Sequence, residues 1–119
     1  MKKTRFGIVG TGRISDWVLK GAVMEPRFEA AAVCSRSQES GKAFAEAHGI
    51  GKVYTDISEM ASDPNIDAIY IGTPNSTHHD LAILCMAHGK HVLCEKPLAS
   101  NAREVGEMID VAKANGVML

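Results

Sequence analysis

Short apolar runs alternate along this chain with longer segments in which apolar residues recur every three or four positions. The runs are rich in small and β-branched side chains, as in buried strands; they cover residues 4–9, 28–34, 52–55, 67–71 and 91–94. The longer segments have the spacing of amphipathic helices; they cover residues 13–24, 37–48, a short stretch from 56, 77–88 and 101–114. This alternation predicts right-handed βαβ crossovers and a parallel sheet covered by helices.

Local signals mark several of these boundaries. Ser37 is placed to cap the second helix, and Gly49 follows its last turn. Asp56 opens the sequence Asp-Ile-Ser-Glu and Thr77 opens Thr-His-His-Asp, and both patterns predict capping boxes. The apolar residues 117–119 predict the start of a sixth strand.

The order of these elements predicts an α/β fold, a Rossmann-type doubly wound parallel sheet with strand order 3-2-1-4-5-6. Ligands of such sheets bind beyond the carboxyl ends of the strands, where the strand order reverses. The loops after the first, second, fourth and fifth strands share that edge; they are residues 10–15, 35–36, 73–75 and 95–97. We therefore expect the polar residues of these four loops to line one crevice.

The sequence Gly-Thr-Gly-Arg-Ile-Ser at residues 10–15 joins the first strand directly to the first helix. Gly10 suits a tight turn, Gly12 lets a pyrophosphate approach the backbone, and the N–H groups of the helix N-terminus can hold a phosphate. Ser15 departs from the G-x-G-x-x-G/A fingerprint but is small enough to keep the helix near the strand. A ligand-free glycine turn is the alternative. We expect a dinucleotide to contact Gly10, Thr11, Gly12, Arg13 and Ile14.

The end of the second strand predicts which dinucleotide is preferred. An NAD-selective site usually places Asp or Glu there, hydrogen-bonded to the ribose 2′-hydroxyl. Here the position holds Ser35, followed by Arg36. Serine does not repel a phosphate, and the arginine can clamp a 2′-phosphate and stack on the adenine. We expect NADP to be preferred, with NAD possible. A capping serine beside a solvated arginine is the alternative interpretation.

Three segments together resemble the N-terminal half of the Gfo/Idh/MocA oxidoreductases, the relatives of glucose-fructose oxidoreductase and inositol dehydrogenase. These segments are residues 7–15, the run Thr-Pro-Asn-Ser-Thr-His at 73–78, and the run at 89–97 that ends in Glu-Lys-Pro. The resemblance covers essentially the whole chain, and residues 92–99 are most similar to the dihydrodiol/D-xylose dehydrogenase branch. It implies that residues 1–119 are a dinucleotide-binding domain. The family's C-terminal substrate domain is absent from this chain, so we expect the fragment alone to be inactive.

The resemblance places Lys96 near the nicotinamide and the reacting carbon of the substrate. An ammonium stabilises a developing alkoxide, and a neutral amine accepts the proton of an alcohol. Burial would lower the pKa of this lysine and Glu95 would raise it, so its protonation state stays open. A solvated surface lysine is the alternative interpretation. The family pattern also implies cofactor contacts from Thr73, Pro74, Asn75, His78, Glu95 and Lys96.

Two further expectations concern histidine and the core. Besides a cofactor contact, a second interpretation of His78 is a residue at the start of a helix with no contact to a cofactor. His78 and His79 point to different sides of a helix, so they make a poor metal pair and no metal is expected. Three large apolar side chains are expected in the core: Trp17, Phe44 and Met108.

Composition and charge narrow the class of protein. A chain of 119 residues with 45% hydrophobic residues is sized for one globular domain. A formal net charge of −1 does not indicate binding to nucleic acid or to an anionic membrane. No leader or membrane span is visible. The cysteines at 34, 85 and 94 are odd in number and lie in apolar segments, which predicts buried thiols and a cytoplasmic location.

Two functions from different classes remain open at this point. The first is the cofactor half of an NADP-dependent oxidoreductase acting on a sugar or cyclic polyol, with that small molecule as substrate. The second is a non-catalytic module that senses the dinucleotide. A nucleotide-binding methyltransferase is weaker, because it leaves Glu-Lys-Pro unexplained. An exposed edge that normally meets the second domain predicts self-association into a homo-oligomer.

Overall fold

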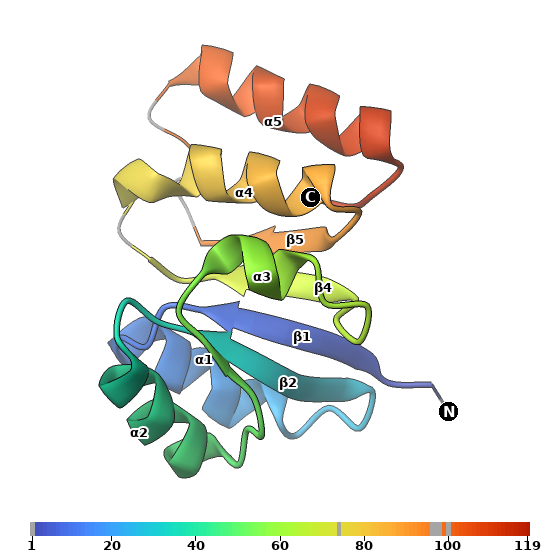
Figure 1. Cartoon of the computed structure of the whole chain (residues 1–119). Helices are drawn as coiled ribbons and strands as arrows, with labels where there is room; N and C mark the ends of the chain where they lie inside the picture. Colours follow the sequence, from blue (N-terminus) through green and yellow to red (C-terminus); the bar gives the residue numbers. More distant parts are fainter. Residues whose placement is uncertain (1, 74, 96–98, 100) are drawn as a thin grey trace.

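A five-stranded parallel sheet forms the centre of the molecule (Figure 1). The computed structural model describes residues 2–73, 75–95, 99 and 101–119. The strands are β1 (Thr4–Val9), β2 (Phe28–Cys34), β3 (Val53–Tyr54), β4 (Ala68–Ile71) and β5 (His91–Cys94). Their order is β3-β2-β1-β4-β5, and every neighbouring pair is parallel. The predicted doubly wound order is confirmed for these strands, and the order reverses between β1 and β4.

The predicted sixth strand is wrong for the described residues. Residues 117–119 are not a strand, although the Val92 N–H donates to the Met118 carbonyl oxygen at 2.9 Å. The Met118 N–H donates to the side chain of His91, at Nδ1, rather than to the backbone of β5. The segment thus lies along the free edge of β5, but so short a segment makes too few main-chain bonds to continue the ladder.

Helices cover both faces of the sheet. The helices are α1 (Arg13–Ala22), α2 (Gln38–His48), α3 (Ile57–Ala61), α4 (His78–Ala87) and α5 (Ala102–Asn115), and a 3₁₀ turn spans Asn75–Thr77. α1 and α2 pack on one face, and α3 and α4 pack on the other, with α5 lying against α4 (Figure 1). Among the described helices, none is both long and apolar enough to cross a bilayer.

The helix ends confirm part of the predicted capping. Ser37 caps α2 by accepting the Ser40 N–H at 3.2 Å, as predicted. Asp56 caps α3 by accepting the Ser58 N–H at 2.8 Å. The capping box predicted at Thr77 is wrong, since its side chain makes no cap hydrogen bond. The 3₁₀ turn runs straight into α4, so Thr77 is already helical (φ −96°, ψ −11°), whereas a capping residue needs an extended backbone.

The core has two layers, one on each face of the sheet. Phe44 of α2 packs with Ile8 and Tyr70 on the first face, and Met108 of α5 belongs to the cluster on the second. These two core predictions are confirmed. The prediction for Trp17 is wrong, because its side chain is 73% exposed. Ser15 and Leu19 are the residues of α1 that face the sheet. Trp17 lies two positions from each of them, so its side chain points away from the sheet.

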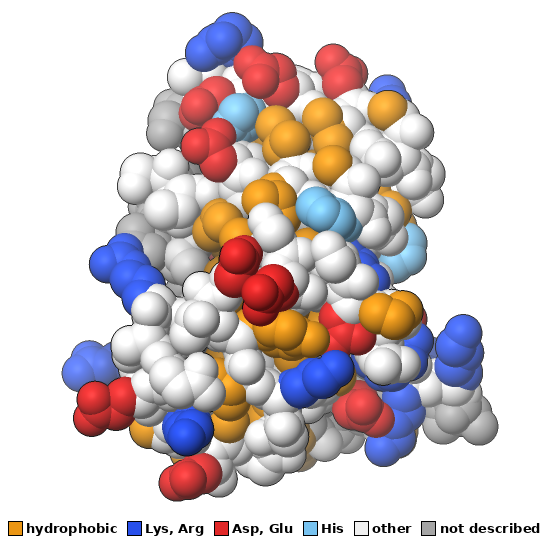
Figure 2. Space-filling model, in the orientation of Figure 1, with side chains coloured by type: hydrophobic (Ala, Val, Ile, Leu, Met, Phe, Trp, Pro, Cys, Tyr) orange, Lys and Arg blue, Asp and Glu red, His pale blue; other side chains and the backbone are white. Residues whose placement is uncertain are grey.

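The other side chains follow the expected division between core and surface. The three cysteines are free; Cys34 and Cys85 are buried, and burial raises the pKa of the Cys34 thiol to about 11. Cys94 is half-buried. Figure 2 shows hydrophobic side chains gathered over the face that α3, α4 and α5 form, with Lys, Arg, Asp and Glu side chains around them.

An ion pair ties the beginning of β1 to the beginning of β4. Arg5 donates to the Asp67 carboxylate from its main-chain N–H, Nε and Nη2, at 2.9, 3.1 and 3.0 Å. The hydrogen bonds from the Arg5 side chain hold the pKa of the Asp67 carboxyl at about 2. Because the ionised carboxylate is the form that these donors stabilise, the pair strengthens the fold most where Asp67 is ionised.

This arrangement predicts an acid-sensitive contribution to stability. The stabilisation should be fully present above about pH 4, the ordinary Asp value, and should be lost as the pH falls through about 2. Asp67→Asn should lower the free energy of unfolding at pH 7 by about 1–2 kcal/mol, and by less than half of that at pH 2. Urea unfolding at both pH values measures this.

Asp110→Asn is the matched control, because it removes the same charge from the exposed face of α5. Its effect should stay within about 0.5 kcal/mol. A deficit in Asp67→Asn that is equally large at both pH values would contradict the assignment.

Candidate dinucleotide-binding site

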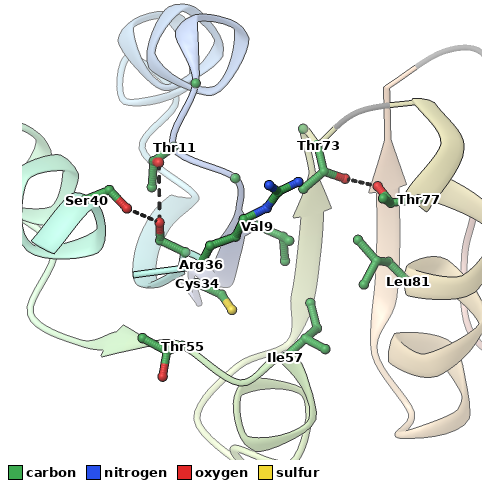
Figure 3. A pocket seen from close by; sticks show the side chains of 14 residues that line it. Val9, Thr11, Cys34, Arg36, Ser40, Thr55, Ile57, Thr73, Thr77 and Leu81 are labelled. Atoms are coloured by element: carbon green, nitrogen blue, oxygen red, sulfur yellow. Dashed lines mark hydrogen bonds between the residues drawn. The ribbon is translucent and has the colours of Figure 1, made fainter. Parts of the chain in front are cut away.

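A cavity of about 460 Å³ opens at the carboxyl ends of β1, β2 and β4, on both sides of the point where the strand order reverses (Figure 3). Three of the four loops predicted to converge contribute to its wall. Six of the predicted contact residues line it: Gly10, Thr11, Gly12, Ser35, Arg36 and Thr73. The sequence-based prediction of a single crevice is therefore consistent with the placement of these loops.

The two glycines of the first loop differ in what requires them. Gly10 has φ +99°, and a Cβ there would lie 2.8 Å from the carbonyl oxygen of Gly72. Gly12 has φ −80°, and a Cβ there would meet nothing within 4 Å. The fold itself thus requires glycine at position 10, whereas at position 12 glycine only keeps space open above the start of α1.

The N-terminus of α1 faces this open space. Gly12 is its N-cap residue and has no side chain to satisfy the first N–H groups. The first hydrogen bond of the helix runs from the Asp16 N–H to the Gly12 carbonyl oxygen, at 3.1 Å. The N–H groups just before it have no acceptor within the helix, and the helix dipole adds positive potential there. Backbone at such a helix start suits a phosphate group.

Close packing between α1 and the end of β4 fixes the direction of this helix. Ser15 is fully buried, and its Oγ lies 2.6 Å from the position that a Cβ of Gly72 would take. Among the described residues this Oγ has no hydrogen-bond partner. The small third residue of the fingerprint therefore does what was predicted, because a larger side chain at position 15 would push α1 away from the sheet.

Hydroxyl groups cluster where β2 ends and α2 begins. The Ser35 Oγ lies within hydrogen-bond distance of the Ser40 Oγ and 3.5 Å from the Thr11 Oγ1 (Figure 3). Ser40 in turn lies 2.8 Å from the Oγ of Ser37, the N-cap residue of α2. These hydroxyls and the N-terminus of α2 place several hydrogen-bond donors at one end of the cavity.

Arg36 starts at this end of the cavity and carries a positive charge. Its side chain is exposed and extends across the cavity in Figure 3, from the end of β2 toward the side where Thr73 lies. Of the described residues that line the cavity, Arg36 alone carries a formal charge, and none is Asp or Glu. The cavity therefore has the electrostatics of an anion site.

The other predicted contact residues take different places. The side chains of Arg13 and Ile14 are exposed at the start of α1 and do not line the cavity. His78 is buried, and its Nε2 donates to the Thr73 carbonyl oxygen at 3.0 Å, so it supports the loop from behind. Glu95 accepts a 2.8 Å hydrogen bond from the Tyr70 hydroxyl. Their contacts with a cofactor stay predictions.

Three predicted site residues lie wholly or partly outside the residues that the structure describes. Pro74 and Lys96 are not among the described residues, and Asn75 is described only as the first residue of the 3₁₀ turn. The roles of these three, including the catalytic role predicted for Lys96, stay predictions.

The cavity also has lining residues that sequence reasoning missed. Ser40, Thr55 and Gly72 are among them, together with apolar side chains from β1, α3 and α4. Ser40 could have been found, since it follows the predicted cap Ser37 by three residues, which places it in the first turn of the helix. Thr55 lies between β3 and α3 and belongs to no motif, and Ile57 is the first residue of α3. Only the tertiary fold brings these two residues to the cavity.

A glycine turn, an open helix N-terminus and an anion site around one cavity at the switch point define a dinucleotide-binding Rossmann domain. The chain belongs to the Gfo/Idh/MocA family: the family model described as "Oxidoreductase family, NAD-binding Rossmann fold" matches residues 4–119.

Individual relatives agree with this assignment. The chain is 50% identical over 115 residues to the scyllo-inositol 2-dehydrogenase (NADP(+)) IolU of Bacillus subtilis, covering 97% of this chain and 35% of that protein. It is 42% identical over 118 residues to the trans-1,2-dihydrobenzene-1,2-diol dehydrogenase of Xenopus laevis, covering 98% and 36%. The crystal structure of KijD10, a 3-ketoreductase from Actinomadura kijaniata in complex with NADP and TDP-benzene, superposes with a TM-score of 0.93 at 29% identity, covering 99% and 36%. The chain thus spans about a third of each of these relatives.

The contrast between the two loop glycines yields a paired prediction. Gly10→Ala should lower the free energy of unfolding by about 2 kcal/mol, because alanine is strained at positive φ and its Cβ meets the Gly72 carbonyl oxygen. Gly12→Ala should cost less than about 1 kcal/mol, because alanine is a poorer N-cap residue than glycine. It should weaken NADP binding about tenfold, because its Cβ would enter the space left for the pyrophosphate.

Chemical denaturation and calorimetric titration of both variants measure these effects. Equal destabilisation by the two substitutions would contradict the distinction between them. Unchanged NADP affinity in Gly12→Ala would show that the space above α1 is not the pyrophosphate site.

Proposed function

We propose that this chain is the NADP-binding domain of an oxidoreductase that transfers a hydride between NADP and a hydroxyl or carbonyl carbon of a sugar or cyclic polyol. The observation that carries the cofactor preference is the cavity at the switch point, in which Arg36 provides the formal charge among the described lining residues. The relatives named above support the reaction class.

The proposed placement of the cofactor follows the residues of the cavity. The pyrophosphate would lie against Gly10, Thr11, Gly12 and the N-terminus of α1, where N–H groups and the helix dipole favour phosphate. The adenosine ribose would lie at the end of β2. The nicotinamide half would then reach the end of β4, where Thr73 lines the wall and His78 supports the loop.

The 2′-phosphate of NADP would be held at the end of β2. Arg36 would pair with it, and the hydroxyls of Ser35 and Ser40 would donate to it. The N-terminus of α2 adds favourable potential for an anion. The 2′-hydroxyl of NAD would meet no carboxylate among the described lining residues, so NAD loses the hydrogen bond that NAD-selective sites supply.

The relatives support the NADP preference and the kind of substrate. The Bacillus subtilis relative carries NADP(+) in its name, and the KijD10 structure contains NADP. Scyllo-inositol and dihydrobenzenediol are both six-membered carbon rings with hydroxyl groups. Because this chain spans about a third of these relatives, we propose that residues 1–119 are the cofactor domain and that a separate C-terminal domain supplies most of the substrate pocket.

Lys96 is the residue that we propose for the chemical step. NADP, when bound, accepts or donates the hydride. The chain must then manage the proton on the substrate oxygen, and an amine next to that oxygen can accept the proton or, as ammonium, stabilise the alkoxide. Glu95, the residue before it, favours the ammonium form.

The proposal also includes a cytoplasmic location and a homo-oligomer. The free thiols support the cytoplasmic location. Exposed apolar side chains such as Trp17 and Leu93 support the homo-oligomer.

The 2′-phosphate assignment predicts a selective loss of affinity. Arg36→Ala should weaken NADP about 10- to 100-fold, because a charge-assisted hydrogen bond is lost, while NAD affinity changes less than about twofold. Calorimetric titration of the purified chain with each cofactor measures both values. Arg103→Ala, on the exposed side of α5, is the matched control for loss of one positive charge and should leave both affinities unchanged. Equal weakening of NADP and NAD by Arg36→Ala would contradict the assignment.

The role of Lys96 is tested in the longer protein that contains this domain. Lys96→Ala should reduce kcat at least about 100-fold, with the dissociation constant for NADP unchanged within about twofold. Lys42→Ala, on the exposed side of α2, is the control. Unchanged turnover would remove Lys96 from the mechanism. A longer protein that binds NADP but turns over no sugar or polyol would favour a dinucleotide-sensing module instead.

A further inference from the structure

Tyr70 is a polar residue in the middle of a buried strand. It is 3% exposed and lies in one row across the sheet, between Ile8 of β1 and Leu93 of β5. A phenylalanine would fill this position with the same ring, so packing alone does not explain the hydroxyl. The hydroxyl donates a 2.8 Å hydrogen bond to the Glu95 Oε1.

The phenol ring extends from the middle of β4 toward the edge of the sheet that carries the cavity. A Cβ at Gly72 would lie 2.8 Å from the Tyr70 Cε2 and 3.0 Å from its hydroxyl oxygen. The ring therefore passes directly beside the backbone of Gly72, which lines the cavity. Because the ring passes beside Gly72, the Tyr70 hydroxyl reaches from the core to Glu95, the residue that follows β5.

Glu95 is attached to β4 at two points. Its N–H donates to the Ile71 carbonyl oxygen at 3.1 Å, and its carboxylate accepts from Tyr70. Both partners belong to the strand whose end, at Gly72 and Thr73, forms the wall of the cavity. The residue immediately before Lys96 is thus fixed in both its backbone and its side chain.

We propose that Tyr70 is a positioning residue that acts on Lys96 through Glu95. By holding the carboxylate of Glu95, the phenol fixes the position of the residue that precedes Lys96 in the chain. It also keeps the negative charge of Glu95 in one place. This inference rests on the role proposed above for Lys96. The phenol remains a neutral donor, because burial and the neighbouring carboxylate raise the pKa of Tyr70.

The first test measures positioning in this chain directly. Tyr70→Phe removes one oxygen atom and keeps the ring. Amide hydrogen exchange, followed by NMR, should accelerate about tenfold at the N–H of Glu95, which donates to the Ile71 carbonyl oxygen, with residues 4–15 unchanged. Tyr54→Phe is the matched control, because the Tyr54 hydroxyl also donates to a carboxylate, the Asp63 Oδ2 at 2.6 Å. It should accelerate exchange near Asp63 and leave exchange at the Glu95 N–H unchanged.

A double-mutant comparison tests whether Tyr70 acts through Glu95. Glu95→Ala should reproduce the exchange of Tyr70→Phe, and the double variant should add less than about twofold to either. Glu95→Gln keeps an oxygen acceptor for the phenol and should preserve most of the protection. In the longer enzyme, Tyr70→Phe should lower kcat about tenfold without changing the KM for NADP.

The outcomes separate this inference from the proposed function. Failure of the wild-type chain to bind NADP would overturn the proposed function. If NADP binds, unchanged exchange at the Glu95 N–H in Tyr70→Phe overturns the positioning role. Additive effects of the two single substitutions, or loss of the folded state in Tyr70→Phe, would assign the hydroxyl to core stability and would also overturn it.

Discussion

The close approach of three small residues, where the carboxyl ends of β1 and β4 meet α1, is the contact on which the rest of the site depends. Gly10 leaves room for the Gly72 carbonyl oxygen, and Gly72 leaves room for the Ser15 Oγ and the Tyr70 ring. Any larger side chain at these positions would separate the two halves of the sheet or tilt α1. Because interiors pack at nearly crystalline density, such a change would not be absorbed locally.

The functional geometry follows from this contact. With α1 pressed against the end of β4, its N-terminus is directed at the space above Gly12, and the ends of β1, β2 and β4 enclose one cavity. The cavity then takes its chemistry from the loops. Backbone N–H groups lie at its centre, hydroxyls lie at the β2 end and Thr73 lies at the β4 end, and the Arg36 side chain extends from the β2 end across the cavity. Tyr70 belongs to the same arrangement, since the absence of a Gly72 side chain lets its phenol reach Glu95.

The fold could be predicted from the sequence because its signals are local and repeated. Apolar runs alternating with helical periodicity specify βαβ units, and the right-handedness of their crossovers leaves few possible strand orders. The errors arose where neighbouring structure overrides a local pattern. Thr77 has a capping sequence, but the preceding 3₁₀ turn makes its backbone helical. Trp17 matches a helical period, but the sheet contacts the Ser15 side of α1 and leaves the indole exposed.

The site could be predicted only in part, for a related reason. The glycine loop and Arg36 carry their chemistry in adjacent residues, so a motif reveals them. Thr55 lies outside any motif, and the pairing of Tyr70 with Glu95 joins residues that are far apart in the chain. Such contacts exist only once the strands are aligned, and the sequence pattern does not specify them.

The central claim is that loops from separate strand ends bind one phosphorylated dinucleotide in a single cavity. Titration of the ¹⁵N-labelled chain with NADP, followed by amide chemical shifts, tests it most directly. The account predicts that residues 10–13, 35–36 and 72–73 shift together with one dissociation constant. Shifts confined to one of these loops, shifts at the opposite edge of the sheet, or no shifts at millimolar NADP would contradict it.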